Sequence, residues 1–120
     1  MTDKAPLGTR IVLRDTLDWE ALTEDQVIAA SAKINRLRAS RGARIITGLP
    51  DRRARIEEHT IDLRGRRLTL RVHRPKSADE RLPLILSLHG GGFIVGTAAQ
   101  NDWLNSHLVA RCPAVVVSVE

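Results

Sequence analysis

The first patterned segment of the chain predicts a helix over residues 16–41. Apolar residues recur there at helical spacing: Val27, Ala30, Ile34 and Leu37. Thr23 and Gln26 have the spacing of a capping box, in which each side chain binds an unpaired backbone N–H at the start of a helix. Gly42 is expected to end the helix, and residues 17–22 to form a separate helical turn. The apolar stripe is expected to pack against a core.

A period of two replaces the helical period after Arg55, and it predicts strands. Ile61 and Leu63 alternate with polar residues, and the same alternation continues through residues 67–74. The two runs, 56–63 and 67–74, are separated by a short connection that contains Gly65. An antiparallel hairpin is therefore expected.

Two later apolar runs, 82–88 and 114–119, are continuous rather than alternating. Such runs are typical of strands covered on both faces of a parallel sheet. Between them lie a glycine-rich loop and a segment, 100–111, that is expected to be a helix ended by Pro113. Strand, helix and strand form a βαβ unit, whose crossover is right-handed. The predicted class is α/β.

Charge and composition narrow the candidate functions. The formal net charge is +5 and the arginines are concentrated between Arg36 and Arg74, but acidic residues are interleaved with them, which is typical of a solvated surface. Two Trp, one Phe and no Tyr are too few aromatics for a surface that stacks single-stranded bases. We therefore expect neither a nucleic-acid nor a membrane partner, although a small basic, non-catalytic binding protein remains the alternative.

The sequence contains neither a metal-ligand motif nor an apolar targeting segment. The one cysteine, Cys112, forms no internal disulfide and offers no metal-ligand spacing. Residues near Met1 contain no apolar leader, and the longest apolar run is too short to cross a bilayer. We expect a cytoplasmic, soluble chain without metal or organic cofactor.

The most informative segment is His89-Gly90-Gly91-Gly92-Phe93, directly after the first continuous apolar run. Three glycines permit unusual backbone angles and leave N–H groups free to face a cleft. Acyl transfer needs such donors where a carbonyl oxygen becomes an anion. A phosphate loop would need Gly-Lys and Ser or Thr, and a dinucleotide loop a different glycine spacing. A tight turn without chemistry is the remaining alternative.

Residues 88–96, together with Asp102 and the closing run 114–120, resemble the hormone-sensitive-lipase family of α/β-hydrolases, in which a His-Gly-Gly-Gly loop follows a strand. Asn101 departs from the family, where histidine is common. The resemblance implies that the N–H groups of Gly91 and Gly92 are oxyanion donors and that His89 supports the loop rather than acting as a base. Phe93 and Ile94 would line the acyl or alcohol pocket, or simply pack in the core.

The resemblance also implies a domain plan and an activity. Residues 1–48 would be an N-terminal helical cap segment, and 49–120 the first part of a hydrolase core with an incomplete sheet. The family hydrolyses carboxylic esters of small molecules with a serine in Gly-x-Ser-x-Gly, and none of the six serines has that setting. We expect the nucleophile and the triad to lie beyond Glu120 and the chain to be inactive alone. An exposed strand edge would favour self-association.

Overall fold

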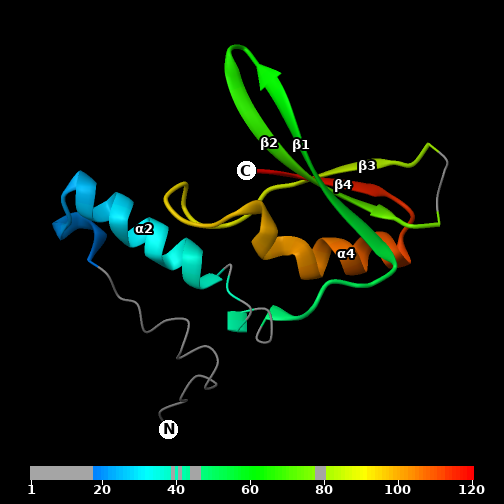
Figure 1. Ribbon diagram of the computed structural model, residues 1–120, viewed down its shortest axis with the longest axis horizontal. Coiled ribbons are helices and arrows are strands. Elements are labelled where there is room, and N and C mark those ends of the chain that lie inside the picture. The colour runs from blue at the N-terminus through cyan, green and yellow to red at the C-terminus, as the bar shows by residue number, and fades with distance from the viewer. Residues whose placement is uncertain (1–17, 39, 41, 44–46, 78–80) are drawn as a thin grey trace, which may run out of the picture.

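A computed structural model describes residues 18–38, 40, 42–43, 47–77 and 81–120 (Figure 1). Its elements, in chain order, are η1 (Trp19–Ala21), α2 (Glu24–Arg38), β1 (Ala54–Leu63), β2 (Arg66–Pro75), β3 (Leu84–Ser87), η2 (Ala98–Asn101), α4 (Asp102–Arg111) and β4 (Val115–Val119). The capping box of α2 forms as predicted, because the Thr23 N–H donates to Gln26 Oε1 at 2.9 Å and the Gln26 N–H to Thr23 Oγ1 at 3.4 Å.

The strands form one mixed sheet in the order β1-β2-β4-β3. Strands β1 and β2 are the expected antiparallel hairpin, and β3 and β4 are the expected parallel pair joined by a helical crossover. Strand β2 pairs antiparallel with β4 and so connects the two units. The predicted α/β class is confirmed.

The hairpin turns through two residues only. Arg64 and Gly65 have φ of 51° and 77°, and two successive positive φ values are what a two-residue type I′ turn requires. Residues 58–67 are exposed, and this end of the hairpin extends beyond the rest of the sheet (Figure 1). The turn thus sets the register in which Leu63 faces Arg66 and Ala54 faces Pro75.

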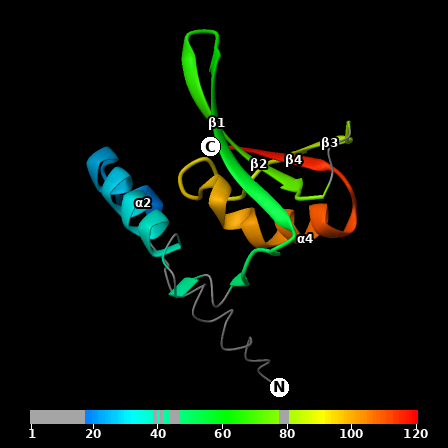
Figure 2. The same ribbon diagram turned by 45° about the vertical axis from the view of Figure 1, so that its right-hand side comes forward.

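Helix α4 covers one face of the sheet (Figure 2). The small apolar core beneath it consists of Ala54, Val109 and Val116, with Leu108 packed against them. The same face also buries polar side chains: His73, Asp102, Asn105, Ser106 and Ser118. Because successive residues of a strand point to opposite faces, the row of Val72, Val117 and Leu86 belongs to the other face.

Two packing predictions are wrong for this chain. Strand β3 was expected to be covered on both faces, but Leu84 is 71% exposed and Leu86 62% exposed, since β3 is the last strand of the described sheet and α4 lies on the opposite face from Leu86. The stripe on α2 was expected to pack in a core, but no residue of α2 is buried. Figure 1 shows α2 beside the glycine loop, away from the strands.

Several boundaries also differ. Helix α2 ends at Arg38, and Gly42 is itself helical instead of being the stop. Helix α4 begins at Asp102, because 98–101 forms a tighter 3₁₀ turn. Residues 16–17, 39 and 41 of the predicted first helix lie outside the described residues. Within the described part of the chain, every helix is too short or too polar to span a bilayer.

Candidate functional site

The glycine loop lies between β3 and η2 and folds into a turn rather than an extended segment. The carbonyl oxygen of Gly91 accepts hydrogen bonds from the N–H groups of Ile94, at 3.1 Å, and Val95, at 3.0 Å. Three successive residues have positive φ: Gly91 (144°), Gly92 (60°) and Phe93 (63°). A non-glycine residue at positive φ is uncommon, so Phe93 is held there by the turn around it.

The loop needs glycine at 91 and 92 for different reasons. A Cβ on Gly91 would overlap the Val95 carbonyl that closes the turn. A Cβ on Gly92 would meet nothing within 4 Å, so that position needs glycine only for its left-handed backbone. By contrast, Gly90 has open space and no left-handed φ.

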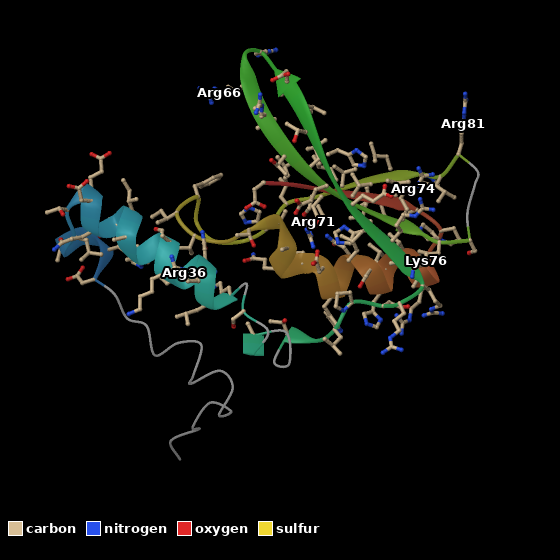
Figure 3. All side chains as sticks on the ribbon, in the orientation of Figure 1. Arg36, Arg66, Arg71, Arg74, Lys76 and Arg81 are labelled. Carbon is tan, nitrogen blue, oxygen red and sulfur yellow. The ribbon has the colours of Figure 1, made fainter. Side chains whose placement is uncertain are left out.

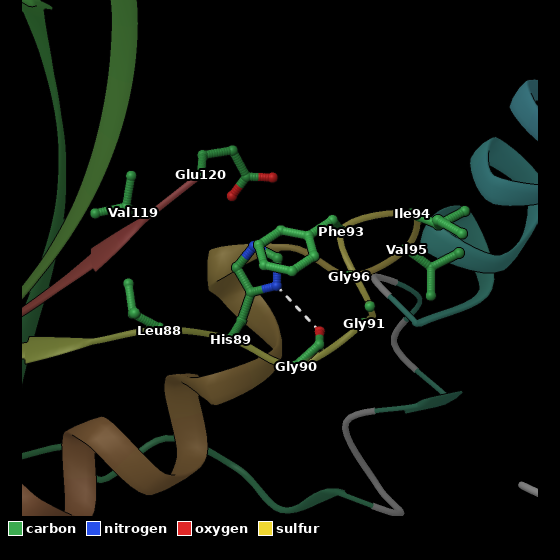
Figure 4. A pocket seen from close by; sticks show the side chains of 11 residues that line it. Leu88, His89, Gly90, Gly91, Phe93, Ile94, Val95, Gly96, Val119 and Glu120 are labelled. Carbon is green, nitrogen blue, oxygen red and sulfur yellow. Dashed lines mark hydrogen bonds between the residues drawn. The ribbon is translucent and has the colours of Figure 1, made fainter.

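The loop lines an open cleft of about 560 Å³ formed by residues 88–96 with Val119 and Glu120 (Figure 4). All the predicted site residues, namely His89, Gly91, Gly92, Phe93 and Ile94, are among its lining. Phe93 is fully exposed and Ile94 is 47% exposed. The alternative in which these two side chains pack in the core is therefore wrong.

The N–H groups of Gly91 and Gly92 have no hydrogen-bond partner among the described residues. In a trans peptide the carbonyl and the following N–H point in opposite directions. Because the Gly91 carbonyl is turned into the loop by Ile94 and Val95, the N–H of Gly92 is directed away from the turn. His89 lies with Nδ1 3.1 Å from the Gly90 carbonyl (Figure 4), where it contacts its own loop.

Three side chains from other elements contact this region, and no motif in the sequence marks them. Asn35 on α2 accepts a hydrogen bond from the Gly96 N–H at 2.8 Å. Gln100 in η2 donates from Nε2 to the Gly90 carbonyl at 2.8 Å. Glu120, directly after β4, accepts from the Ala98 N–H at 2.7 Å. Of the three, only Glu120 could have been expected near the loop from the sequence. It directly follows β4, and β4 pairs in parallel with β3, the strand that leads into the loop.

A part-buried ion pair anchors the helix that follows the site. Asp102, the first residue of α4, binds the Arg71 guanidinium through two bonds of 2.6 and 2.7 Å and His73 Nε2 at 3.0 Å. Figure 3 shows Arg71 between the hairpin and α4. Burial raises the pKa of Asp102, but hydrogen bonds from His73 and Arg71 outweigh it and leave that pKa below its usual value. A carboxylate at a helix N-terminus is also favoured by the helix dipole.

No serine lines the cleft within the described residues. In the same part of the chain, His, Cys, Asp and Glu side chains do not gather in groups of three or more that would hold a metal ion. The site thus offers backbone donors, one histidine and one carboxylate.

Comparison with known proteins shows which fold the loop and its neighbouring elements resemble. A family model for the alpha/beta hydrolase fold matches residues 85–120, which include the whole glycine loop. An esterase from Pyrobaculum calidifontis is 27% identical and superposes with a TM-score of 0.71 over 96% of this chain and 34% of its own. Residues 85–120 thus match the α/β-hydrolase family, and the chain has the fold of these esterases. The family predicted from residues 88–96 is therefore confirmed.

Two further structures are also similar to this chain. A bacterial heroin esterase is 26% identical with a TM-score of 0.64, over 80% of this chain and 30% of its own. A thermostable esterase from Pseudomonas putida, 24% identical, shares the fold with a TM-score of 0.66 over all of this chain and 36% of its own. The chain spans about a third of the length of these structures. No curated protein matches the sequence.

Proposed function

We propose that this chain carries the oxyanion-binding part of a serine carboxylic-ester hydrolase of the hormone-sensitive-lipase type. The observation that supports the proposal is the turn at Gly91 and Gly92, which leaves both N–H groups unpaired among the described residues beside an open cleft. Backbone N–H donors held in place beforehand stabilise the negative charge that develops on an ester carbonyl oxygen during attack by the nucleophile. Esterases among the matched structures favour the same chemistry.

In this proposal a small-molecule ester lies in the cleft with its carbonyl oxygen toward Gly91 and Gly92. Attack by a serine converts that oxygen to an anion, and each donor lowers the barrier by about 2.7–4 kcal/mol, or roughly 10²–10³ in rate. His89 holds the loop, and Phe93 and Ile94 contact the acyl or alcohol group. The reaction needs no metal or organic cofactor.

The nucleophile would come from sequence that this chain does not contain. The fold places it in Gly-x-Ser-x-Gly, followed by Asp or Glu and then His, and the 120 residues hold no such serine. Donors without a nucleophile retain only a residual part of catalysis. We therefore propose that the chain alone is inactive, that 1–48 is a cap segment and 49–120 the first part of the core, and that the protein is cytoplasmic.

A chimera tests the proposal. Residues 18–120 would replace the equivalent third of the Pyrobaculum calidifontis esterase, which supplies the rest of the fold. We expect the chimera to hydrolyse a short-chain p-nitrophenyl ester and to react with a fluorophosphonate, and the 120-residue chain to do neither. A labelled serine in the chain alone, or a folded chimera without turnover, would count against the proposal.

The alternative of a basic binding protein has less support. Arg36 lies on α2, Arg66 near the hairpin turn and Arg81 beside β3, at separate ends of the molecule (Figure 3). Other arginines are paired, as Arg53 is with Asp51 and Arg71 with Asp102. Affinity for an acidic polymer that falls steeply with salt would favour the alternative.

A further inference from the structure

We infer that Gln100 is a positioning residue: its side-chain amide holds the Gly90 carbonyl so that the Gly91 N–H faces the cleft. The inference rests on the proposed oxyanion role of that N–H. It concerns how the donor is oriented, which neither the glycine motif nor the family match assigns.

The argument begins with the peptide between Gly90 and Gly91. The peptide bonds of the described residues are all trans, so the Gly90 carbonyl and the Gly91 N–H share a plane and point in opposite directions. Gln100 Nε2 donates to this carbonyl at 2.8 Å, and His89 Nδ1 lies 3.1 Å from it. Two side chains thus fix the carbonyl on one side of the loop, which sets the N–H on the other.

The second proposed donor does not need such support. The Gly92 N–H belongs to the peptide whose carbonyl, at Gly91, is held by two backbone N–H groups of the same turn. Glycine on both sides gives the 90–91 peptide unusual rotational freedom, and no backbone N–H of the described loop binds its carbonyl. The orientation of the Gly91 N–H therefore depends on side-chain hydrogen bonds, whereas that of the Gly92 N–H depends on backbone hydrogen bonds.

Gln100 is itself held at both ends of its element. The first N–H of η2, at Ala98, donates to the Glu120 carboxylate at 2.7 Å. The next element, α4, begins at Asp102, which is bound to Arg71 and His73. Because η2 is fixed between these contacts, Gln100 presents its amide from a rigid support, as a precise site requires.

The first measurement uses the 120-residue chain and amide hydrogen exchange followed by mass spectrometry. Gln100→Met keeps the length of the side chain and removes the donor. Rotation of the 90–91 peptide would displace Gly91 and weaken the bonds from Ile94 and Val95, whose exchange should accelerate about fivefold for the loss of one hydrogen bond. Asn101→Leu is the matched control, because Asn101 is adjacent and makes no side-chain cap bond. Gln100→Lys restores a donor and should exchange like the original chain.

The second measurement uses the chimera. Oxyanion contacts act in the transition state, so Gln100→Met should lower kcat about fivefold and leave KM unchanged, with Asn101→Leu unaffected. Unchanged exchange in Gln100→Met would overturn the inference, as would faster exchange with an unaltered kcat. If the parent chimera is folded but inactive, the proposed function fails, and the exchange data still decide whether Gln100 fixes the loop.

Discussion

The three glycines of the loop should respond differently to the same added methyl group. At Gly90 a Cβ has free space and the backbone is not left-handed. At Gly92 a Cβ also has free space, but φ is 60°. At Gly91 the φ of 144° is combined with overlap of the Val95 carbonyl. One substitution, glycine to alanine, therefore separates open space, backbone strain and steric overlap within three consecutive residues.

The expected change in the free energy of unfolding differs between the three variants. Gly90→Ala should be neutral or stabilise by about 0.4–1 kcal/mol, since it restricts the unfolded chain. Gly92→Ala should cost about 1–2 kcal/mol, the usual penalty of a left-handed residue. Gly91→Ala should cost about 3 kcal/mol or more, because a sparsely populated backbone region alone costs up to about that amount and the overlap adds to it. The turn would open rather than accept the methyl group.

Catalysis should follow the same order in the chimera with the Pyrobaculum calidifontis esterase. Opening the turn at Gly91 displaces both donors, so kcat for a p-nitrophenyl ester should fall by at least about 10²–10³. Gly92→Ala keeps both N–H groups and should lose far less, and Gly90→Ala should be unchanged. Urea unfolding of each variant supplies the stability and shows that the proteins compared are folded. Equal kcat values for Gly90→Ala and Gly91→Ala would refute the described turn and the donor roles with it.

Further substitutions and an acid titration test the scaffold. Asp102→Asn should destabilise the chain by about 1–3 kcal/mol, because the part-buried Arg71 and the buried His73 would lose a charged hydrogen-bond partner. Glu58→Gln, which removes a 64% exposed partner of the same arginine, should cost at most about 1 kcal/mol. Equal losses of stability in urea would contradict this. The folded pKa of Asp102 lies below its usual value, so its contribution is present above a pH of about 4 and lost as the pH falls further, which an acid titration followed by circular dichroism would show. Arg64→Asn should stabilise the hairpin by about 0.5–1 kcal/mol, because asparagine tolerates positive φ; a lower urea midpoint would be the opposite result. Self-association through β3 should weaken in Leu86→Lys, since a charge on an edge strand discourages strand pairing. The expectation would be contradicted if the unsubstituted chain sedimented as a monomer at low concentration and unfolded cooperatively in urea.

Local patterns predicted most of the elements. The alternation around Leu68 and Leu70 identified the hairpin, and Thr23 with Gln26 identified the start of α2, because each pattern reflects contacts within a few residues. The burial of α2 and β3 was predicted wrongly. An apolar stripe shows that a face would be stabilised by burial, but it carries no information about which segment covers it. No element in the described ranges covers the outer face of β3, so Leu86 is exposed.

The same distinction between local and distant contacts applies to the candidate site. His89 and the glycines are adjacent in sequence, so the loop could be predicted from this short motif and its position after an apolar run. Asn35 and Glu120 lie 61 and 22 residues from the amides they bind. Each makes a single hydrogen bond worth about 1 kcal/mol, too weak a constraint to impose a recognisable spacing. Their roles become visible only when the fold brings distant segments together.

The two proposed donors should therefore differ in how they respond to changes elsewhere in the chain. The Gly92 N–H is set by bonds that close within residues 91–95, so any sequence that keeps this turn keeps the donor. The Gly91 N–H depends on Gln100, and Gln100 lies in the turn that immediately precedes Asp102. A substitution that loosens α4 from the sheet at Asp102 would thus disturb the orientation of the Gly91 N–H more than that of the Gly92 N–H. A distant substitution that weakens this helix should reduce the oxyanion contribution of one donor, while the other stays in place.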